Sequence, residues 1–192
     1  MIVFGLILAW LVVIVVNRIF FSFEDAAGLT CRETGEAITL MPGDTKTVSI
    51  DGRFELPVFN ASAVCQNMGV LLKQDATYNI SFESSQQFRD QLYASNKYSV
   101  GRFNLKWTTL FPFRRILSRP WFTAVARIGS VGAEDYFLDP QQDGSINEEM
   151  KATKSGELFL YVNDAIIAIP PLYDLFYKNN AGSTKVVIKR KS

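Results

Sequence analysis

The first 21 residues of the chain are almost entirely apolar. Residues 1–16 read MIVFGLILAWLVVIVV, Asn17 and Arg18 interrupt the run, and Ile19, Phe20 and Phe21 resume it. A helix needs about 20 apolar residues to cross a bilayer, and a long arginine side chain can carry its charge to the membrane surface. The pattern therefore predicts one transmembrane helix over residues 1–21.

A removable signal peptide is the competing interpretation of this run. Signal peptides begin with basic residues before the apolar core and end at a small-residue cleavage site. Neither feature is visible around residues 1–21. The missing basic start also leaves open that Met1 is an internal point of a longer protein.

Beyond the apolar run, the pattern of hydrophobic positions changes to that of strands. Residues 22–37 are polar and contain Gly28 and Gly35, which is typical of a linker. Residues 77–82 alternate strictly, so that Tyr78, Ile80 and Phe82 share one face of a predicted strand. At least eight short segments of this kind follow one another between turn residues, among them 45–50, 54–59, 69–72, 121–128, 158–162 and 184–189. We therefore predict an all-β sandwich domain over residues 38–192.

Composition narrows the possible functions. The chain has no histidine, which excludes Ser-His-Asp and Cys-His catalysis within it and removes the commonest zinc ligand. Because no nucleophile and base can be paired from the sequence, we expect no enzyme. Lys and Arg number 20 against 19 Asp and Glu. This balance gives no general attraction to nucleic acid, which we exclude as a partner.

The two cysteines, Cys31 and Cys65, leave two interpretations open. They are far apart in the chain and form no C-x-x-C motif, so a metal or redox site is not indicated. They are either two separate buried thiols or one disulfide formed in an oxidising compartment.

The C-terminal segment, residues 156–190, carries the candidate binding residues. It predicts a strand, a loop with paired prolines and a second strand. Asp164, Asn179 and Asn180 lie around this loop and offer carboxylate and amide oxygens. Hard cations such as Ca²⁺ take ligands of that kind. The alternative is that these side chains shape the turn by bonding nearby backbone groups.

This segment resembles the soluble, calcium-dependent galactose-binding lectins of bacteria. Their last hairpin carries Tyr-Asn-Asp-Val and Tyr-Gly-Asn-Asn-Ser-Gly-Ser elements, and this chain has Val-Asn-Asp-Ala at 162–165 and Tyr-Lys-Asn-Asn-Ala-Gly-Ser at 177–183. The resemblance implies a jelly-roll-like β-sandwich, a Ca²⁺ ion held by Asp164, Asn179 and Asn180, and a bound glycan. Two departures are a longer loop after Asp164 and the absence of the lectins' histidine near the sugar.

Aromatic and basic residues alternate in residues 103–119, FNLKWTTLFPFRRILSR. An anchored domain could rest this stretch on the membrane, with aromatic rings at headgroup level and arginines beside anionic lipid. Contact with a protein partner and ordinary core packing are the alternatives. The candidate contact residues are Trp107, Phe111, Phe113, Arg114 and Arg115.

These patterns together predict a membrane-anchored, non-catalytic, lectin-like binding domain, with Ca²⁺-dependent glycan or ligand binding. A structural or assembly subunit of a membrane protein complex is the alternative, as is an accessory domain of a larger membrane-associated hydrolase. Arg18 alone would favour a cytoplasmic domain by the positive-inside rule. We nevertheless expect the domain outside the cytoplasm, in a bacterial periplasm.

Overall fold

The computed structural model describes residues 2–48, 58–82, 88–90, 109–141 and 145–192. They form one long helix, α1 (Ile2–Ala26), followed by a β-rich domain with three short 3₁₀ turns, η1 (Phe111–Phe113), η2 (Pro170–Leu172) and η3 (Tyr177–Asn179). The strands are β1 (Ile38–Thr39), β2 (Thr45–Val48), β3 (Phe59–Asn60), β4 (Gln66–Leu72), β5 (Thr77–Phe82), β6 (Arg89–Asp90), β7 (Ala124–Ile128), β8 (Glu134–Leu138), β9 (Ile146–Lys151), β10 (Gly156–Val162), β11 (Asn180–Ala181), β12 (Ser183–Thr184) and β13 (Val186–Arg190).

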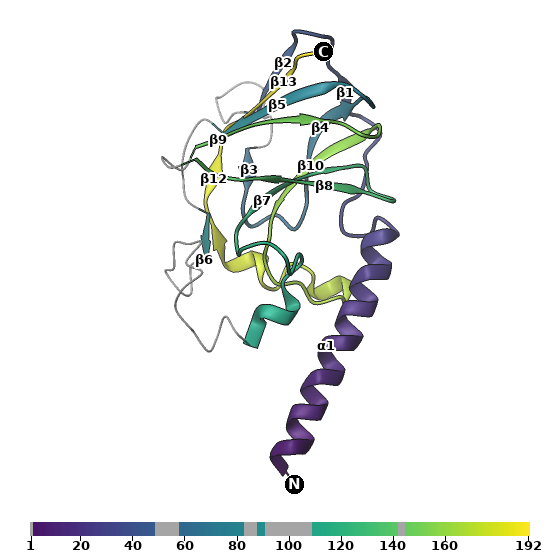
Figure 1. The fold of residues 1–192 in the computed structure, drawn as a ribbon, viewed down its shortest axis with the longest axis vertical. Coiled ribbons are helices and arrows are strands. Elements are labelled where there is room, and N and C mark those ends of the chain that lie inside the picture. The colour runs from purple at the N-terminus through teal and green to yellow at the C-terminus, as the bar shows by residue number, and fades with distance from the viewer. Residues whose placement is uncertain (1, 49–57, 83–87, 91–108, 142–144) are drawn as a thin grey trace.

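The apolar run forms the expected helix, and the helix is longer than expected. It continues through Asn17 and Arg18 to Ala26, and its N-terminal half projects from the β-domain (Figure 1). The segment from Val3 to Ala26 is long and apolar enough to cross a membrane. A signal sequence near the N-terminus has the same length and apolar composition as a membrane anchor.

Two main sheets form the β-domain. One has five strands in the order β1-β4-β10-β7-β8, and the other has four in the order β2-β13-β5-β9. Strands β11 and β6 form a small two-stranded pair, as do β12 and β3. The prediction of a mostly β domain with two sheets is therefore confirmed. This strand order does not by itself establish the expected jelly-roll connectivity.

The hydrophobic core lies between the two sheets. Tyr78, Ile80 and Phe82 of β5 are buried, as their alternation predicted. They belong to one cluster with Leu158 and Leu160 of β10, a strand that is buried along its whole length. A strand in a five-stranded sheet loses solvent on both faces only when its outer face is also covered.

The segment that covers this outer face is the one expected to be a linker. Residues 22–26 belong to α1, and the chain after them is fixed to the five-stranded sheet by a disulfide between Cys31 and Cys65. The carboxylate of Glu157 in β10 accepts hydrogen bonds from the backbone N–H groups of Thr34 (3.0 Å) and Gly35 (2.6 Å). These contacts hold the segment against the sheet, so α1 is not joined to the domain by a free tether.

Candidate functional site

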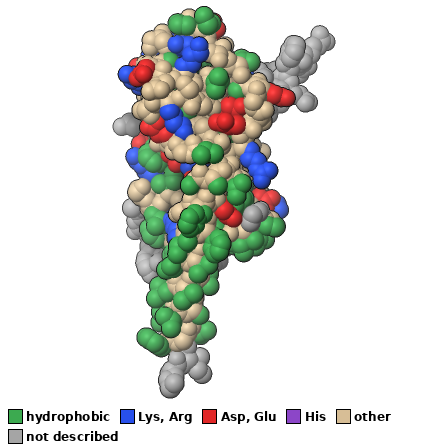
Figure 2. All heavy atoms as spheres, turned by 90° about the vertical axis from the view of Figure 1, so that its right-hand side faces the viewer, with side chains coloured by type: hydrophobic (Ala, Val, Ile, Leu, Met, Phe, Trp, Pro, Cys, Tyr) green, Lys and Arg blue, Asp and Glu red, His purple; other side chains and the backbone are tan. Residues whose placement is uncertain are grey.

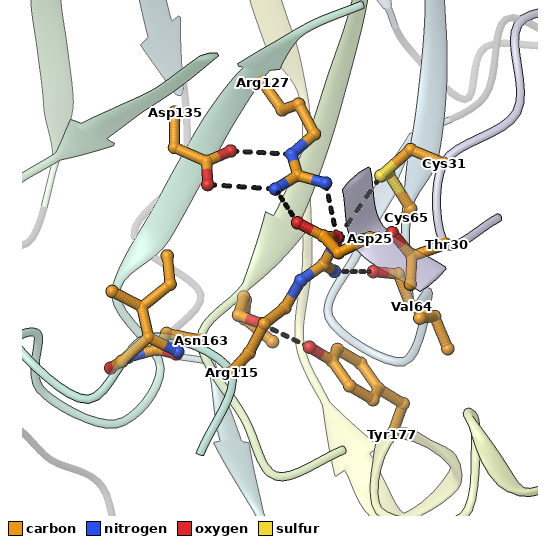
Figure 3. A network of polar contacts seen from close by, with 12 residues as sticks. Asp25, Thr30, Cys31, Val64, Cys65, Arg115, Arg127, Asp135, Asn163 and Tyr177 are labelled. Atoms are coloured by element: carbon orange, nitrogen blue, oxygen red, sulfur yellow. Dashed lines mark hydrogen bonds and ion pairs between the residues drawn. A yellow bond between two sulfur atoms is a disulfide. The ribbon is translucent and has the colours of Figure 1, made fainter. Parts of the chain in front are cut away.

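A network of buried arginines and partly buried carboxylates joins the end of α1 to the five-stranded sheet (Figure 3). Arg127 of β7 donates to Asp25 through both terminal nitrogens, with Nη1–Oδ1 and Nη2–Oδ2 each 2.6 Å. Its Nε lies 2.7 Å from Asp135 Oδ1 on β8. Arg115 Nη2 reaches Asp25 Oδ1 at 3.3 Å. We call Asp25, Arg115, Arg127 and Asp135 the docking network. Two positive and two negative groups balance in it.

The arginines lie here because β7 and β10 pair in the centre of the sheet. Arg127 is opposite Phe159, and Val125 is opposite Tyr161. Tyr161 is completely buried, and its ring lies under the guanidinium of Arg115, 3.6 Å from the ring centroid. A cation over an aromatic face is attracted by the ring quadrupole, and the attraction strengthens when water is excluded.

Further hydrogen bonds hold Arg115 at the junction. Its Nη1 donates to the carbonyl oxygen of Val64 at 2.8 Å, and its Nη2 donates to Thr30 Oγ1 at 3.3 Å. The same Nη2 lies 3.5 Å from Cys31 Sγ. Arg115 therefore contacts the end of α1, the segment after it and the chain beside Cys65.

The electrostatic environment favours the charged forms of Asp25 and Arg127. Burial by itself lowers the pKa of Arg127, but the hydrogen bonds and negative charges of Asp25 and Asp135 outweigh it and raise the pKa above its ordinary value. Asp25 stands in the last turn of α1, where the helix dipole disfavours a negative charge. The two arginines compensate that unfavourable position, and a buried pair with this geometry breaks only at a large cost.

Contacts between α1 and the domain continue towards the N-terminus. The side chain of Asn17 accepts from Ala168 N–H at 2.8 Å and donates to the carbonyl oxygen of Ile166 at 3.2 Å. Arg18 donates to the carbonyl oxygens of Arg114 (2.6 Å) and Arg115 (3.3 Å). Further along, the rings of Trp10 and Phe113 stand 5.3 Å apart. The helix is thus bound to the domain from Trp10 to Asp25, and its polar residues make most of the specific contacts.

A pH-dependent contribution to stability is expected from Glu157. Burial raises the pKa of its carboxyl group, but the hydrogen bonds from Thr34, Asn67 and Gly35 outweigh burial and lower it. In the unfolded chain the pKa of a glutamate is about 4.3. Because the pKa is lower in the folded state, Glu157 stabilises the fold at pH values above about 4.3, and this contribution is lost as pH falls through the folded-state pKa. We therefore expect Glu157→Gln to flatten the loss of unfolding free energy below about pH 4, measured by urea titration at several pH values. Glu36→Gln, an exposed carboxyl on the same segment, is the control and should keep the wild-type profile. Identical profiles for Glu157→Gln and wild type would contradict the assignment.

The structure brings two of the three predicted calcium ligands together. Asn180 Nδ2 donates to Asp164 Oδ2 at 2.8 Å and to the carbonyl oxygen of Ala61 at 3.2 Å. Asp164 Oδ1 accepts from Ala165 N–H at 2.7 Å, and both residues are buried. Asn179 ends the turn η3 and is half-buried. The arrangement joins β10, η3 and β11 around one carboxylate.

The calcium site expected at Asp164, Asn179 and Asn180 stays a prediction, and Asn180 Oδ1 is buried without a hydrogen-bond partner among the described residues. Ca²⁺ requires several oxygens directed at one point. Here Asn180 turns its NH₂ group, not its oxygen, to the carboxylate, and each Asp164 oxygen already accepts a hydrogen bond. Within the described residues, no group of three or more His, Cys, Asp and Glu side chains is placed to hold a metal ion. The contacts correspond to the turn-shaping role that the sequence left as the alternative.

A comparison of melting temperatures tests the role of Asp164. Because its carboxylate satisfies buried donors, we expect Asp164→Ala to lower the unfolding free energy by about 1–3 kcal/mol. We also expect the wild-type melting temperature to be the same with calcium and with a chelator. Asn179→Ala, at the half-buried neighbouring position in the sequence to Asn180, is the matched comparison. A rise in melting temperature with calcium that disappears in Asp164→Ala would instead restore the calcium site.

The five predicted membrane or partner contacts separate into different environments. Trp107 lies outside the described residues. Phe113 is buried against Trp10, whereas Phe111 is exposed. Arg114 is buried with its guanidinium 4.6 Å from the Phe111 ring centroid, and Arg115 belongs to the docking network. Arg115 therefore binds the end of α1 through Asp25, whereas the side chain of Arg114 lies over the rings of Phe111 and Trp121.

Asp25 and Arg127 were not among the residues predicted from the sequence, and they lie 102 positions apart in the chain. One signal was present, since Arg127 is the single charged residue in the otherwise apolar run 124–128. A charge inside a buried strand requires a partner. The chain matches no model of a protein family, no curated protein and no solved structure.

Proposed function

We propose that this chain is a non-catalytic, membrane-anchored domain with a structural or assembly role, held outside the cytoplasm in a fixed orientation. The observation that carries the proposal is the docking network, which binds the end of α1 to the five-stranded sheet. A flexible linker would let the domain take many heights and angles above the membrane. A domain that must stand at one height and angle needs a stiff connection of the kind seen here.

Retention of α1 follows from the same contacts. A cleaved signal peptide would take Asn17 with it and remove its two hydrogen bonds to buried backbone groups at Ile166 and Ala168. Unpaired buried backbone groups are costly. The apolar helix and the disulfide together suggest secretion or membrane anchoring, and these helix contacts support the anchor. A disulfide persists in oxidising compartments, which supports a location outside the cytoplasm.

The lectin-like alternative has less support from the geometry. Both oxygens of Asp164 accept hydrogen bonds, from Ala165 N–H and from Asn180 Nδ2, which supports a turn-shaping role for this carboxylate. The calcium melt described above remains its direct test.

An assembly role is tested by comparing wild type with Asp25→Asn in the native membrane. After an alkaline carbonate wash, both proteins should remain with the membrane, and the N-terminal sequence should begin before Asn17. After gentle detergent extraction, wild type should migrate as a complex larger than the single chain. Asp25→Asn should lose that complex, because its helix no longer fixes the domain. A monodisperse wild-type monomer, or a chain that begins after Asn17, would overturn the proposal.

A further inference from the structure

The position of the β-domain along α1 leaves too little free helix to cross a membrane. Trp10 contacts Phe113, so the domain reaches at least this far towards the N-terminus. Residues 2–9 extend only about 12 Å at the α-helical rise, against about 30 Å for the hydrocarbon core. If α1 enters the bilayer, the part of the domain beside Trp10 must enter with it or the contact must break.

The polar residues of α1 indicate where the membrane surface lies. Asn17 and Arg18 are the first polar side chains of the helix, and both bind backbone groups of the domain. The hydrocarbon core therefore begins on the N-terminal side of these two residues. The turn η1 lies beside the middle of α1, away from the sheets (Figure 1). Its ring contact at Trp10 is about 10 Å further along the helix than Asn17, which places it below the membrane surface.

Exposed apolar side chains gather on this part of the domain. They are 37–51% exposed and lie around η1 and η2: Phe111, Leu117, Ile169, Leu172 and Leu175. We call these five residues the membrane-facing rim. Figure 2 shows apolar side chains covering the projecting helix, while most charged side chains on this face lie on the upper part of the domain. The turn η1 contacts α1 at Trp10, and the chain around η2 packs against Phe21 of the same helix, so both parts of the rim adjoin α1.

We infer that the membrane-facing rim enters the same leaflet as α1, so that the chain binds the bilayer through both α1 and the rim. The inference rests on the proposed membrane anchor and specifies the orientation of the domain on the bilayer. We assign lipid as the partner of the rim, because the rim adjoins an apolar helix of membrane-crossing length and η1 lies at the depth of Trp10. Apolar side chains at headgroup depth bury surface that water would otherwise cover.

Lipid-quenching fluorescence on the full chain tests the inference. Single cysteines at Phe111 and Leu172 carry a bimane label in the rim, and one at Val12, an exposed helix position, reports the anchor itself. Val131→Cys is the control, because Val131 is exposed just after Ser130, which packs beside Gly28 beyond the end of α1. Each protein is reconstituted in phosphatidylcholine vesicles with or without brominated acyl chains. Non-reducing gels confirm that the Cys31–Cys65 disulfide is intact.

We expect the Phe111, Leu172 and Val12 labels to lose most of their fluorescence in brominated vesicles, while the Val131 label keeps it. Quenching at Val12 with neither rim label quenched would overturn the rim inference and leave the anchor standing. No quenching at Val12 would overturn the anchor as well. Because the vesicles contain no other protein, rim labels that stay unquenched there would show that lipid does not cover this surface.

Discussion

Replacing Asp25 with alanine is expected to lower the free energy of unfolding by about 3–5 kcal/mol, the usual cost of removing one partner from a buried ion pair. The substitution leaves two buried arginines beside a single carboxylate, that of Asp135. The side chains of Arg115 and Arg127 are 1% and 5% exposed, so water cannot replace the lost partner. Denaturant unfolding of the full chain in detergent measures the loss, and α1 should detach in the same variant.

The control for Asp25→Ala is Glu149→Gln, which removes the charge from an ion pair with Lys191 in which both side chains are about half exposed. Exposed pairs contribute about 0–1 kcal/mol, so this variant should unfold almost as wild type does. Equal losses in the two variants would mean that the docking network stabilises the protein no more than a surface pair. In that case α1 would be bound mainly by apolar contacts such as those of Phe21, Ile166 and Ala168.

Removing the disulfide is the second large effect. The Cys31→Ser, Cys65→Ser double variant should lose about 3–4 kcal/mol of unfolding free energy, because the bond closes a loop of 34 residues and restricts the unfolded chain. The loss should also loosen the segment after α1, since Cys31 is buried beside Arg115. Thermal or denaturant unfolding under oxidising conditions measures it.

Reduction supplies the matched control for the disulfide. Adding a reductant should bring wild type to the stability of the double variant and leave the double variant unchanged. A wild-type protein that keeps its full stability after complete reduction would show that packing, and not the covalent bond, holds the segment on the sheet.

Much of the fold could be predicted from the sequence, because helices and strands leave a periodic pattern of apolar residues within a short stretch of chain. The uninterrupted apolar run gave α1, the strict alternation of residues 77–82 gave β5, and the apolar run at 158–162 gave most of β10. The helix end was placed at residue 21 because the polar residues that follow look like a linker. The structure instead continues the helix to Ala26, where Asp25 is paired with Arg115 and Arg127.

The docking network lay beyond sequence reasoning for a physical reason. Asp25 and Arg127 are 102 residues apart, and only the folded sheet brings them together. Residues 22–37 looked like a linker because polarity and glycine are typical of one. Polar residues serve equally well to bond a covering segment to a sheet, as Glu157 does with Thr34 and Gly35. Composition cannot distinguish these two uses of polarity.

The resemblance at the C-terminal hairpin shows a similar limit. The sequence placed Asp164 and Asn180 near each other correctly. It did not show that the Asn180 amide nitrogen would donate both to the Asp164 carboxylate and to the carbonyl oxygen of Ala61, far away in the chain.

The central claim is that α1 and the β-domain form one rigid body on the membrane. The most direct test is the distance distribution between spin labels at Val15 and Val131. Pulsed electron paramagnetic resonance measures this distribution in vesicles. Both positions are exposed, and they lie on either side of the contacts made by Asn17 and Asp25. We predict a single narrow distribution in wild type that broadens in Asp25→Ala. A broad distribution in the wild-type protein would contradict the claim and return residues 22–37 to the role of a flexible linker.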